Sequence, residues 1–248
     1  MNSKDIMDFS ILKQGNDSNE CFMENYSINY LKDKIAYVFT INRNEYIYIY
    51  DIKSKKWQHI WNEYKLIDYY GFDVLWDKND NLYFDSWGII LDKNNMVIEP
   101  REIYREIYKY NDNTQYVNLL INDYNLHSAS LDYENILIEN CENYFPEYYV
   151  YNFNEQKIIQ SFQENFIDGK ISWANNSKYI AYYDKDLKTI YIYSILSSKT
   201  YEQNINHIIG NSYLTEIRAE DDYFIFFIGR YDSGYTYSIK IKNLNEIK

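Results

Sequence analysis

The sequence contains little glycine, proline and cysteine. Its 248 residues include 7 Gly, 2 Pro and 2 Cys. The two cysteines, Cys21 and Cys141, are too few for a disulfide framework and lack the paired spacing of a metal-binding cluster. We therefore expect no bound metal and free thiols, with a single disulfide between the two cysteines as the alternative.

Long apolar runs are also missing. No stretch approaches the ~18 consecutive apolar residues that a membrane-spanning helix needs. Residues 1–20 contain no apolar run beside a basic flank, which a secretory signal would show. From these two absences we expect a cytoplasmic protein.

Basic residues are outnumbered. The chain has 25 Lys and Arg against 37 Asp and Glu, which gives a formal net charge of -12. No run of basic residues is longer than the pair formed by Lys55 and Lys56. Because nucleic acids and anionic membranes are bound through basic surfaces, we expect neither as a partner. A basic protein or peptide suits this charge better.

Aromatic residues, by contrast, are abundant, since they make up 19% of the chain and 31 residues are Tyr. Disordered chains are poor in aromatic residues, so disorder is not expected. Tyrosine favours strands, because its apolar ring packs on the sheet while its hydroxyl reaches water. With 46% hydrophobic residues, the chain has enough apolar material for a core.

The clearest pattern lies at residues 171–201, which read "ISWANNSKYIAYYDKDLKTIYIYSILSSKTY". Four short segments alternate between two kinds of side chain, and polar turns separate them. In the third segment Ile190 and Ile192 alternate with Tyr191 and Tyr193, which is the period of a strand. Similar units occur five times, at intervals of roughly 45 residues with one longer step.

This unit resembles a blade of the WD-repeat and TolB-like β-propellers. The "WANNS" that begins at Trp173 takes the turn that in this family reads aromatic-Ser-Pro-Asp-Gly. Tyr50-Asp51 and Tyr193-Ser194 stand where a blade closes with Trp-Asp, and the Gly-His signature is absent. Because Gly and Pro are scarce, we expect Asn and Asp to take the left-handed turn positions.

The predicted fold is all-β, a single domain over residues 1–248 with about five four-stranded blades. Six thinner blades, or an antiparallel sandwich or barrel, are the alternatives. The longer step predicts an insertion at 100–123, either a short helix from Pro100 or a long outer strand and its return. In that unit, "GIILD" and "MVIE" are the expected third and fourth strands. For the last blade, "NLNEIK" is a weak fourth strand that the N-terminal "DFSILK" would complete or flank.

Signatures of catalysis are absent. There is no phosphate-binding glycine loop, no nucleophile elbow, and His59, His127 and His207 are isolated. Asp77, Asn79 and Asn81 match the start of a calcium loop. However, Leu82 and Gly88 stand where Gly and Glu are required, so this segment is expected to be a turn. No cofactor is expected.

Carboxylates raise one enzymatic alternative, since five-bladed propellers include glycosidases whose acids lie on inner strands. A chain with 37 acidic residues supplies such candidates by chance, so we assign no catalytic residue and expect no enzyme. A sugar-binding or glycoside-cleaving propeller remains the alternative. The candidates on first or second strands are Asp73, Asp85, Glu139, Asp184 and Glu216.

Four of the tryptophans fall into two pairs with different expected roles, one in packing and one in binding. Trp76 and Trp173 occupy the same place in two units, so we expect them to pack between blades. Trp57 and Trp61 break the repeat pattern and are candidate binding residues. Two tyrosines of the predicted insertion join this set, Tyr104 and Tyr108. The resulting expectation is a monomeric, non-enzymatic module that recognises a protein or peptide.

Overall fold

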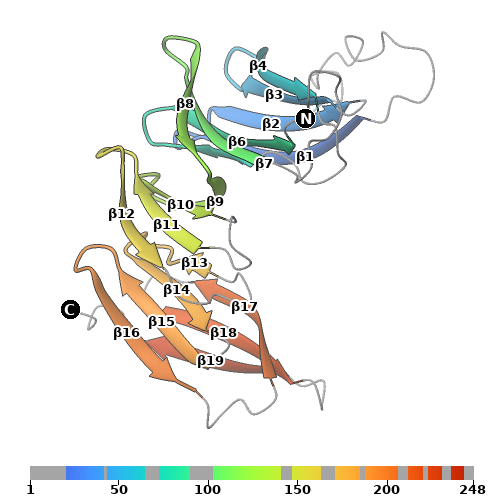
Figure 1. Cartoon of the computed structure of the whole chain (residues 1–248). Helices are drawn as coiled ribbons and strands as arrows, with labels where there is room; N and C mark the ends of the chain where they lie inside the picture. The colour runs from blue at the N-terminus through green and yellow to red at the C-terminus, as the bar shows by residue number, and fades with distance from the viewer. Residues whose placement is uncertain are drawn as a thin grey trace. The chain divides into compact units, whose positions relative to one another are not determined.

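Nineteen strands, in five antiparallel sheets, make up the regular structure of the described residues. The computed structural model describes residues 21–41, 44–64, 73–89, 103–140, 147–162, 171–184, 188–205, 212–219, 223–230 and 236–242. Within these ranges there is no helix, and so none that could span a membrane. In every sheet, strands that follow one another in the chain lie side by side, as Figure 1 shows.

Two sheets belong to the first of two compact units, residues 1–128. The first sheet contains β1 (Cys21–Ile28), β2 (Lys34–Ile41), β3 (Asn44–Asp51) and β4 (Lys56–Tyr64). The second sheet contains β5 (Val74–Trp76), β6 (Asn81–Ile89), β7 (Ile103–Asn111) and β8 (Tyr116–Asn122). Each first strand forms one edge of its sheet and each fourth strand the other.

The second unit spans residues 129–248. The third sheet, whose first strand begins in the first unit, contains β9 (Asn125–Ala129), β10 (Asn135–Asn140), β11 (Glu147–Asn152) and β12 (Lys157–Phe162). The fourth sheet contains β13 (Ile171–Trp173), β14 (Tyr179–Asp184), β15 (Thr189–Ser194) and β16 (Lys199–Asn204). The fifth sheet has three described strands, β17 (Ser212–Ala219), β18 (Tyr223–Arg230) and β19 (Thr236–Lys242).

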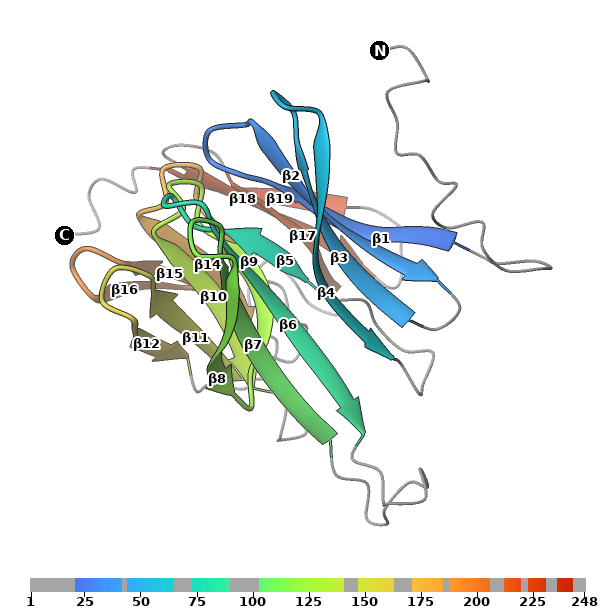
Figure 2. The ribbon, with the colours of Figure 1, turned by 90° about the horizontal axis from the view of Figure 1, so that it is seen from above.

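Five separate meander sheets confirm the predicted blades and do not fit the two sheets of a sandwich. Residues 103–122, which we had assigned to an insertion, form β7 and β8, the ordinary third and fourth strands of the second sheet. Figure 2 shows β6 and β7 as long neighbouring strands. The helix alternative at these residues is wrong. The assignment of "GIILD" as a third strand is also wrong, because β6 continues to Ile89.

Several predictions concern residues outside the described ranges. They include "MVIE", the proposed fourth strand "NLNEIK", the N-terminal "DFSILK" and Cys141. The extra length of the second repeat falls between β6 and β7, at residues 90–102, which are also outside these ranges.

The alternating Ile and Tyr side chains of β15 pack into two hydrophobic clusters, one on each face of the strand. Ile190 and Ile192 pack with Phe224 and Phe226 of the fifth sheet. Tyr191 and Tyr193 point to the other face and join a cluster that includes residues of the third sheet. Every residue of β15 is therefore buried, as expected for a strand covered on both faces.

Trp76 and Trp173 pack between neighbouring sheets, which confirms their predicted role. Each is the last residue of a three-residue first strand. Trp76 is fully buried, and its Nε1 donates to the carbonyl oxygen of Ser27 on the first sheet at 3.1 Å. Trp173 lies in the core shared by the third and fourth sheets. In both sheets the tryptophan at this position thus contacts the neighbouring sheet and stabilises the packing of the two sheets.

The turns repeat as regularly as the strands. Between first and second strands, the left-handed residue donates its backbone N–H to the carbonyl of the residue three places earlier. The four left-handed residues are Lys32, Asp80, Tyr133 and Ser177, with φ of 56°, 60°, 58° and 60°. Asp80 is the one Asp among these four and none is Asn, so the prediction that Asn and Asp take these positions is confirmed at one of the four turns and wrong at the other three.

Asparagine and aspartate instead cap the turns with their side chains. Between the third and fourth strands, Asn111 Oδ1 accepts the N–H of Thr114 at 3.0 Å, and Asn152 Oδ1 accepts that of Glu155 at 2.8 Å. Such bonds stabilise turns without requiring a left-handed Asn. The left-handed residue follows directly, as at Gln115.

Candidate binding face on the first sheet

One face of the first sheet is a grid of aromatic side chains. Tyr26 on β1 pairs with Tyr37 on β2, Tyr37 pairs with Tyr48 on β3, and Tyr48 pairs with His59 on β4. Cross-strand partners point to the same face of a sheet. These four side chains therefore form one row that crosses all four strands.

Two further rows flank this one. Ile28, Ile35, Tyr50 and Trp57 are paired in the same way on one side, and Met23, Phe39 and Tyr46 on the other. We call the three rows together the aromatic face. Its members are Met23, Tyr26, Ile28, Ile35, Tyr37, Phe39, Tyr46, Tyr48, Tyr50, Trp57 and His59. None of these residues is Asp, Glu, Lys or Arg.

The rings of the aromatic face hold one another in place. The Trp57 ring centroid lies 4.8 Å from that of Tyr50 and 5.4 Å from that of Tyr37. Tyr48 and His59 are 5.1 Å apart. Burial raises the pKa of both Tyr37 and Tyr48 above the ordinary tyrosine value. These rings form a preordered surface, since mutual packing restricts their rotation.

The aromatic face is most accessible along its edge strand. On β1, Met23 is 55% exposed and Tyr26 is 56% exposed, and His59 at the far end of the central row is also exposed. Phe39 is only 6% exposed. Exposed apolar groups that are contiguous, rather than scattered, are typical of interaction surfaces.

The opposite face of the first sheet packs on the second sheet. Its small apolar side chains are buried, and Trp61 lies 5.6 Å from Phe84 and 4.9 Å from Tyr108 between ring centroids. Phe84 and Tyr108 stack in turn at 5.5 Å. Trp61 and Tyr108 therefore meet in the seam between the first two sheets, and there they stabilise the fold.

The four predicted binding residues thus do not share one surface. Trp57 lies on the aromatic face, whereas Trp61 and Tyr108 lie in the seam. Tyr104 is part of β7, and its side chain is outside the described residues. Sequence reasoning missed the tyrosine row that begins at Tyr26, although the alternating "YIYIYD" signalled one aromatic side of β3.

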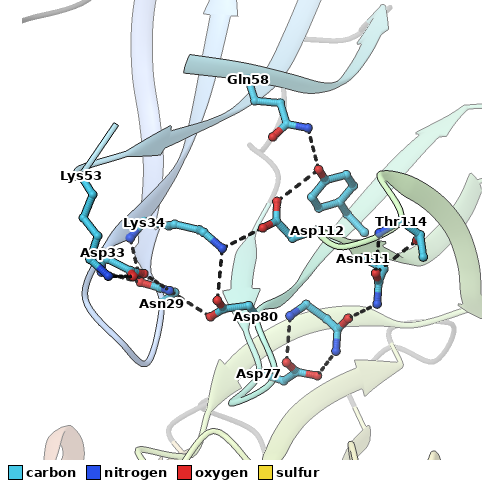
Figure 3. A network of polar contacts seen from close by, with 12 residues as sticks. Asn29, Asp33, Lys34, Lys53, Gln58, Asp77, Asp80, Asn111, Asp112 and Thr114 are labelled. Carbon is cyan, nitrogen blue, oxygen red and sulfur yellow. Dashed lines mark hydrogen bonds and ion pairs between the residues drawn. The ribbon is translucent and has the colours of Figure 1, made fainter. Parts of the chain in front are cut away.

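Polar contacts lock the turn ends of the first two sheets together (Figure 3). Lys34 Nζ lies 3.1 Å from Asp80 and 2.7 Å from Asp112, and Gln58 donates to the Tyr110 hydroxyl at 2.7 Å. Burial would lower the pKa of Lys34, but its hydrogen bonds with the two aspartates raise it. Burial, together with Asp112, raises the pKa of Tyr110 to about 12. This network joins two sheets and leaves little of Lys34 accessible.

The segment predicted as a turn rather than a calcium loop is a turn. Asp77 is buried, and its Oδ1 accepts the backbone N–H groups of Asn79 and Asn81. Its Oδ2 accepts the side chains of Asn81 and Tyr83. Across the described residues, no group of three or more His, Cys, Asp or Glu is arranged to hold a metal ion.

Among the five candidate carboxylates, the structure connects Asp73 and Asp85. Asp85 Oδ1 accepts the backbone N–H of Asp73 at 2.7 Å, and its Oδ2 accepts that of Leu126 at 3.0 Å. Asn25 donates to Asp73 at 2.6 Å. Burial, and to a lesser extent Asp73, raises the pKa of Asp85 to about 8. Asp85 therefore connects the second sheet to the start of β9.

The other three carboxylates lie apart from this pair. Asp184 is buried at the end of β14, and Glu139 lies on β10. Glu216 is exposed and forms an ion pair with Arg218 at 3.2 Å. These three carboxylates therefore lie on three different sheets.

Comparison with known proteins identifies the fold. No protein-family model matches the sequence, and no curated protein matches it. Among solved structures, a prolyl endopeptidase is similar over 93% of this chain, with a TM-score of 0.66 at 11% identity. The β-propeller domain of the Trilobed protease from Pyrococcus furiosus matches 92% of the chain, with a TM-score of 0.57 at 11% identity. The chain has a β-propeller fold.

TolB from Acinetobacter baumannii is also similar, over 91% of this chain, with a TM-score of 0.50 at 14% identity. The chain spans 55% of that TolB, 35% of the prolyl endopeptidase and 72% of the protease propeller domain. The resemblance to propellers of the TolB-like type, expected from the repeat unit, is thereby confirmed at the level of the blade.

Proposed function

We propose that this propeller is a non-enzymatic binding module whose aromatic face receives an extended segment of a partner protein. The observation that carries this proposal is the set of three cross-strand rows. They contain no Asp, Glu, Lys or Arg, and their most exposed apolar members lie on the edge strand β1. Tyr and Trp are enriched at protein interfaces because they supply contact area at low entropic cost.

A cationic segment fits this face best. Aromatic rings attract ammonium and guanidinium groups through their negative faces. The chain has a formal net charge of -12, which raises the local concentration of basic partners. We expect Arg or Lys side chains of the partner to lie over the central row between Tyr26 and His59.

The glycoside-cleaving alternative finds less support. It requires two or more carboxylates open to a sugar, and the structure connects the candidates Asp73 and Asp85. Asp85 is 4% exposed and both of its oxygens accept backbone N–H groups. This carboxyl group is buried and joins strands, so it is not open to a sugar.

Fluorescence anisotropy with three short labelled peptides tests the proposal. In all three peptides every second residue is Leu or Tyr. The residues between them are Arg in the first peptide, Glu in the second and Ser in the third, so that the peptides differ in charge. We expect the Arg peptide to bind most tightly. The double variant Tyr26→Ser, Trp57→Ser should weaken its binding by on the order of tenfold or more, as loss of an interface aromatic anchor does.

Tyr116→Ser is the matched control, because Tyr116 is 70% exposed on β8 of the second sheet. This variant should bind the Arg peptide as the wild type does. Equal binding of the Arg and Ser peptides would contradict the cationic preference. Unchanged binding in the double variant would contradict the assignment of the surface.

A further inference from the structure

A second surface lies at the turn end of the first sheet. Two turns form it, the one between β1 and β2 and the one between β3 and β4. The backbone N–H of Ile52 donates to the carbonyl oxygen of Asp33 at 2.8 Å and holds the turns side by side. We call residues 30–33 and 52–56 the lysine end.

Four lysines of these turns are exposed, Lys32, Lys53, Lys55 and Lys56, and the Lys53 side chain is 78% accessible. Lys32 and Lys55 occupy the left-handed positions of their turns, with φ of 56° and 57°. This conformation is sterically unfavourable for a residue with a side chain. Both turns therefore present a lysine where a glycine would be more stable.

The carboxylates of the lysine end are already engaged. Asp33 accepts the Lys53 ammonium at 2.7 Å and the Asn29 amide at 2.8 Å. Asp51, next to this end, accepts the backbone N–H of Ser54 at 2.6 Å. Lys32 and Lys56 form no ion pair within the described part of the chain. The accessible charge of this end is positive, in contrast with the chain as a whole.

Apolar side chains accompany these lysines. Leu31 is 63% exposed, Tyr30 is 52% exposed and Ile52 is 39% exposed. The corresponding turns of the second sheet instead carry the carboxylates of Asp80 and Asp112. An exposed surface that combines apolar and cationic groups is suited to a ligand that combines apolar and anionic groups.

We propose that the lysine end binds a short acidic segment of a partner protein, one that contains apolar residues. A short segment interacts only with charges within a Debye length of about 8–10 Å. A membrane or a nucleic acid presents negative charge over a larger area and would be repelled by the rest of an acidic chain. This inference rests on the lysine end alone and is independent of the aromatic face.

The Glu peptide described above, titrated at low salt and at about 0.15 M salt, is the probe. We expect it to bind the wild type, more weakly at the higher salt. The double variant Lys32→Glu, Lys56→Glu should reduce its affinity by on the order of tenfold. Leu31→Ser should also reduce it, since the apolar contact is lost.

The matched control is Lys178→Glu, Lys199→Glu, which changes charge equally at the corresponding turns of the fourth sheet, where both lysines are exposed. It should leave Glu-peptide affinity within about twofold of the wild type, in keeping with local screening. The lysine-end variants should still bind the Arg peptide, which separates this proposal from the aromatic face.

Three results would overturn the inference. The first is no measurable binding of the Glu peptide by the wild type at low salt. The second is an equal loss of affinity in the lysine-end variant and in the fourth-sheet control. The third is tight binding to vesicles that contain anionic lipid, without binding to the Glu peptide.

Discussion

Asp85 shows how a single residue acquires a property that its sequence context does not reveal. Nothing in "NLYFDSWG" marks this aspartate as different from its neighbours. Burial and the adjacent Asp73 raise its pKa to about 8, while hydrogen bonds from backbone N–H groups, those of Asp73 and Leu126 first, act in the opposite direction. The folded protein therefore retains a proton on Asp85 at neutral pH.

This proton makes the free energy of unfolding depend on pH. The folded state keeps the proton up to about pH 8, whereas the unfolded carboxyl loses it near the ordinary aspartate pKa of 3.8. The contribution of this group to the free energy of unfolding is thus complete below pH 3.8. It is lost as the pH rises toward 8, by up to about 1.4 kcal/mol per pH unit.

Urea unfolding at several pH values between 4 and 8 measures this slope. The variant Asp85→Asn should lose most of it, because its amide does not titrate. It should also be less stable than the wild type at pH 4, since its amide nitrogen cannot accept a backbone N–H. A variant with the same slope as the wild type would show that Asp85 is not the titrating group.

Lys34 is a second residue whose role depends on its surroundings. It lies between Asp80 and Asp112 with 17% of its side chain accessible. Lys34→Met leaves two aspartates without their shared cation, so we expect a loss of about 1–3 kcal/mol in the free energy of unfolding.

Lys53→Met provides the comparison, because Lys53 also binds one aspartate but is 78% accessible. Exposed ion pairs contribute little, so this variant should unfold at nearly the wild-type urea concentration. A similar loss in both variants would mean that burial does not distinguish the two lysines.

At the scale of strands and turns, alternation was a reliable guide and turn chemistry was not. The pattern of "TIYIYSI" correctly predicted a strand with two faces, because each face meets a different core. The short segment "GIILD" reads as a separate apolar strand, yet its first residues continue β6. Such short segments do not show where a strand ends, because that depends on pairing with a distant strand.

The left-handed turn residues allow a test at this scale. Gln115 has a φ of 59° in the turn between β7 and β8. Gln115→Gly removes the steric cost of a side chain there, and the gain exceeds the entropic cost of glycine. We expect an increase of about 0.5–1 kcal/mol in the free energy of unfolding, measured in urea.

Asn113→Gly, in the same turn, is the control, since Asn113 is not among the described residues with positive φ. There glycine adds flexibility without relieving strain, so this variant should be no more stable than the wild type. If Gln115→Gly also fails to stabilise the protein, the strain assigned to the turn is absent.

At the scale of the whole molecule, the repeat was readable from the sequence but the candidate binding surface was not. Five units with similar strands predicted a propeller. Trp57 and Trp61 looked alike in sequence, because both follow the same turn. A register shift between Ile47 and Tyr48 in the pairing of β3 with β4 sends them to opposite faces of the sheet. Only the pairing shows that Trp57 belongs with the tyrosine rows and Trp61 with the seam.

The central claim is that the aromatic face of the first sheet receives a partner segment. Amide hydrogen exchange, followed with and without the Arg peptide, tests it most directly. The account predicts slower exchange in β1 and β4 when the peptide is bound, with β8 and β16 unchanged. Unchanged exchange throughout the first sheet, together with protection confined to other sheets, would contradict it.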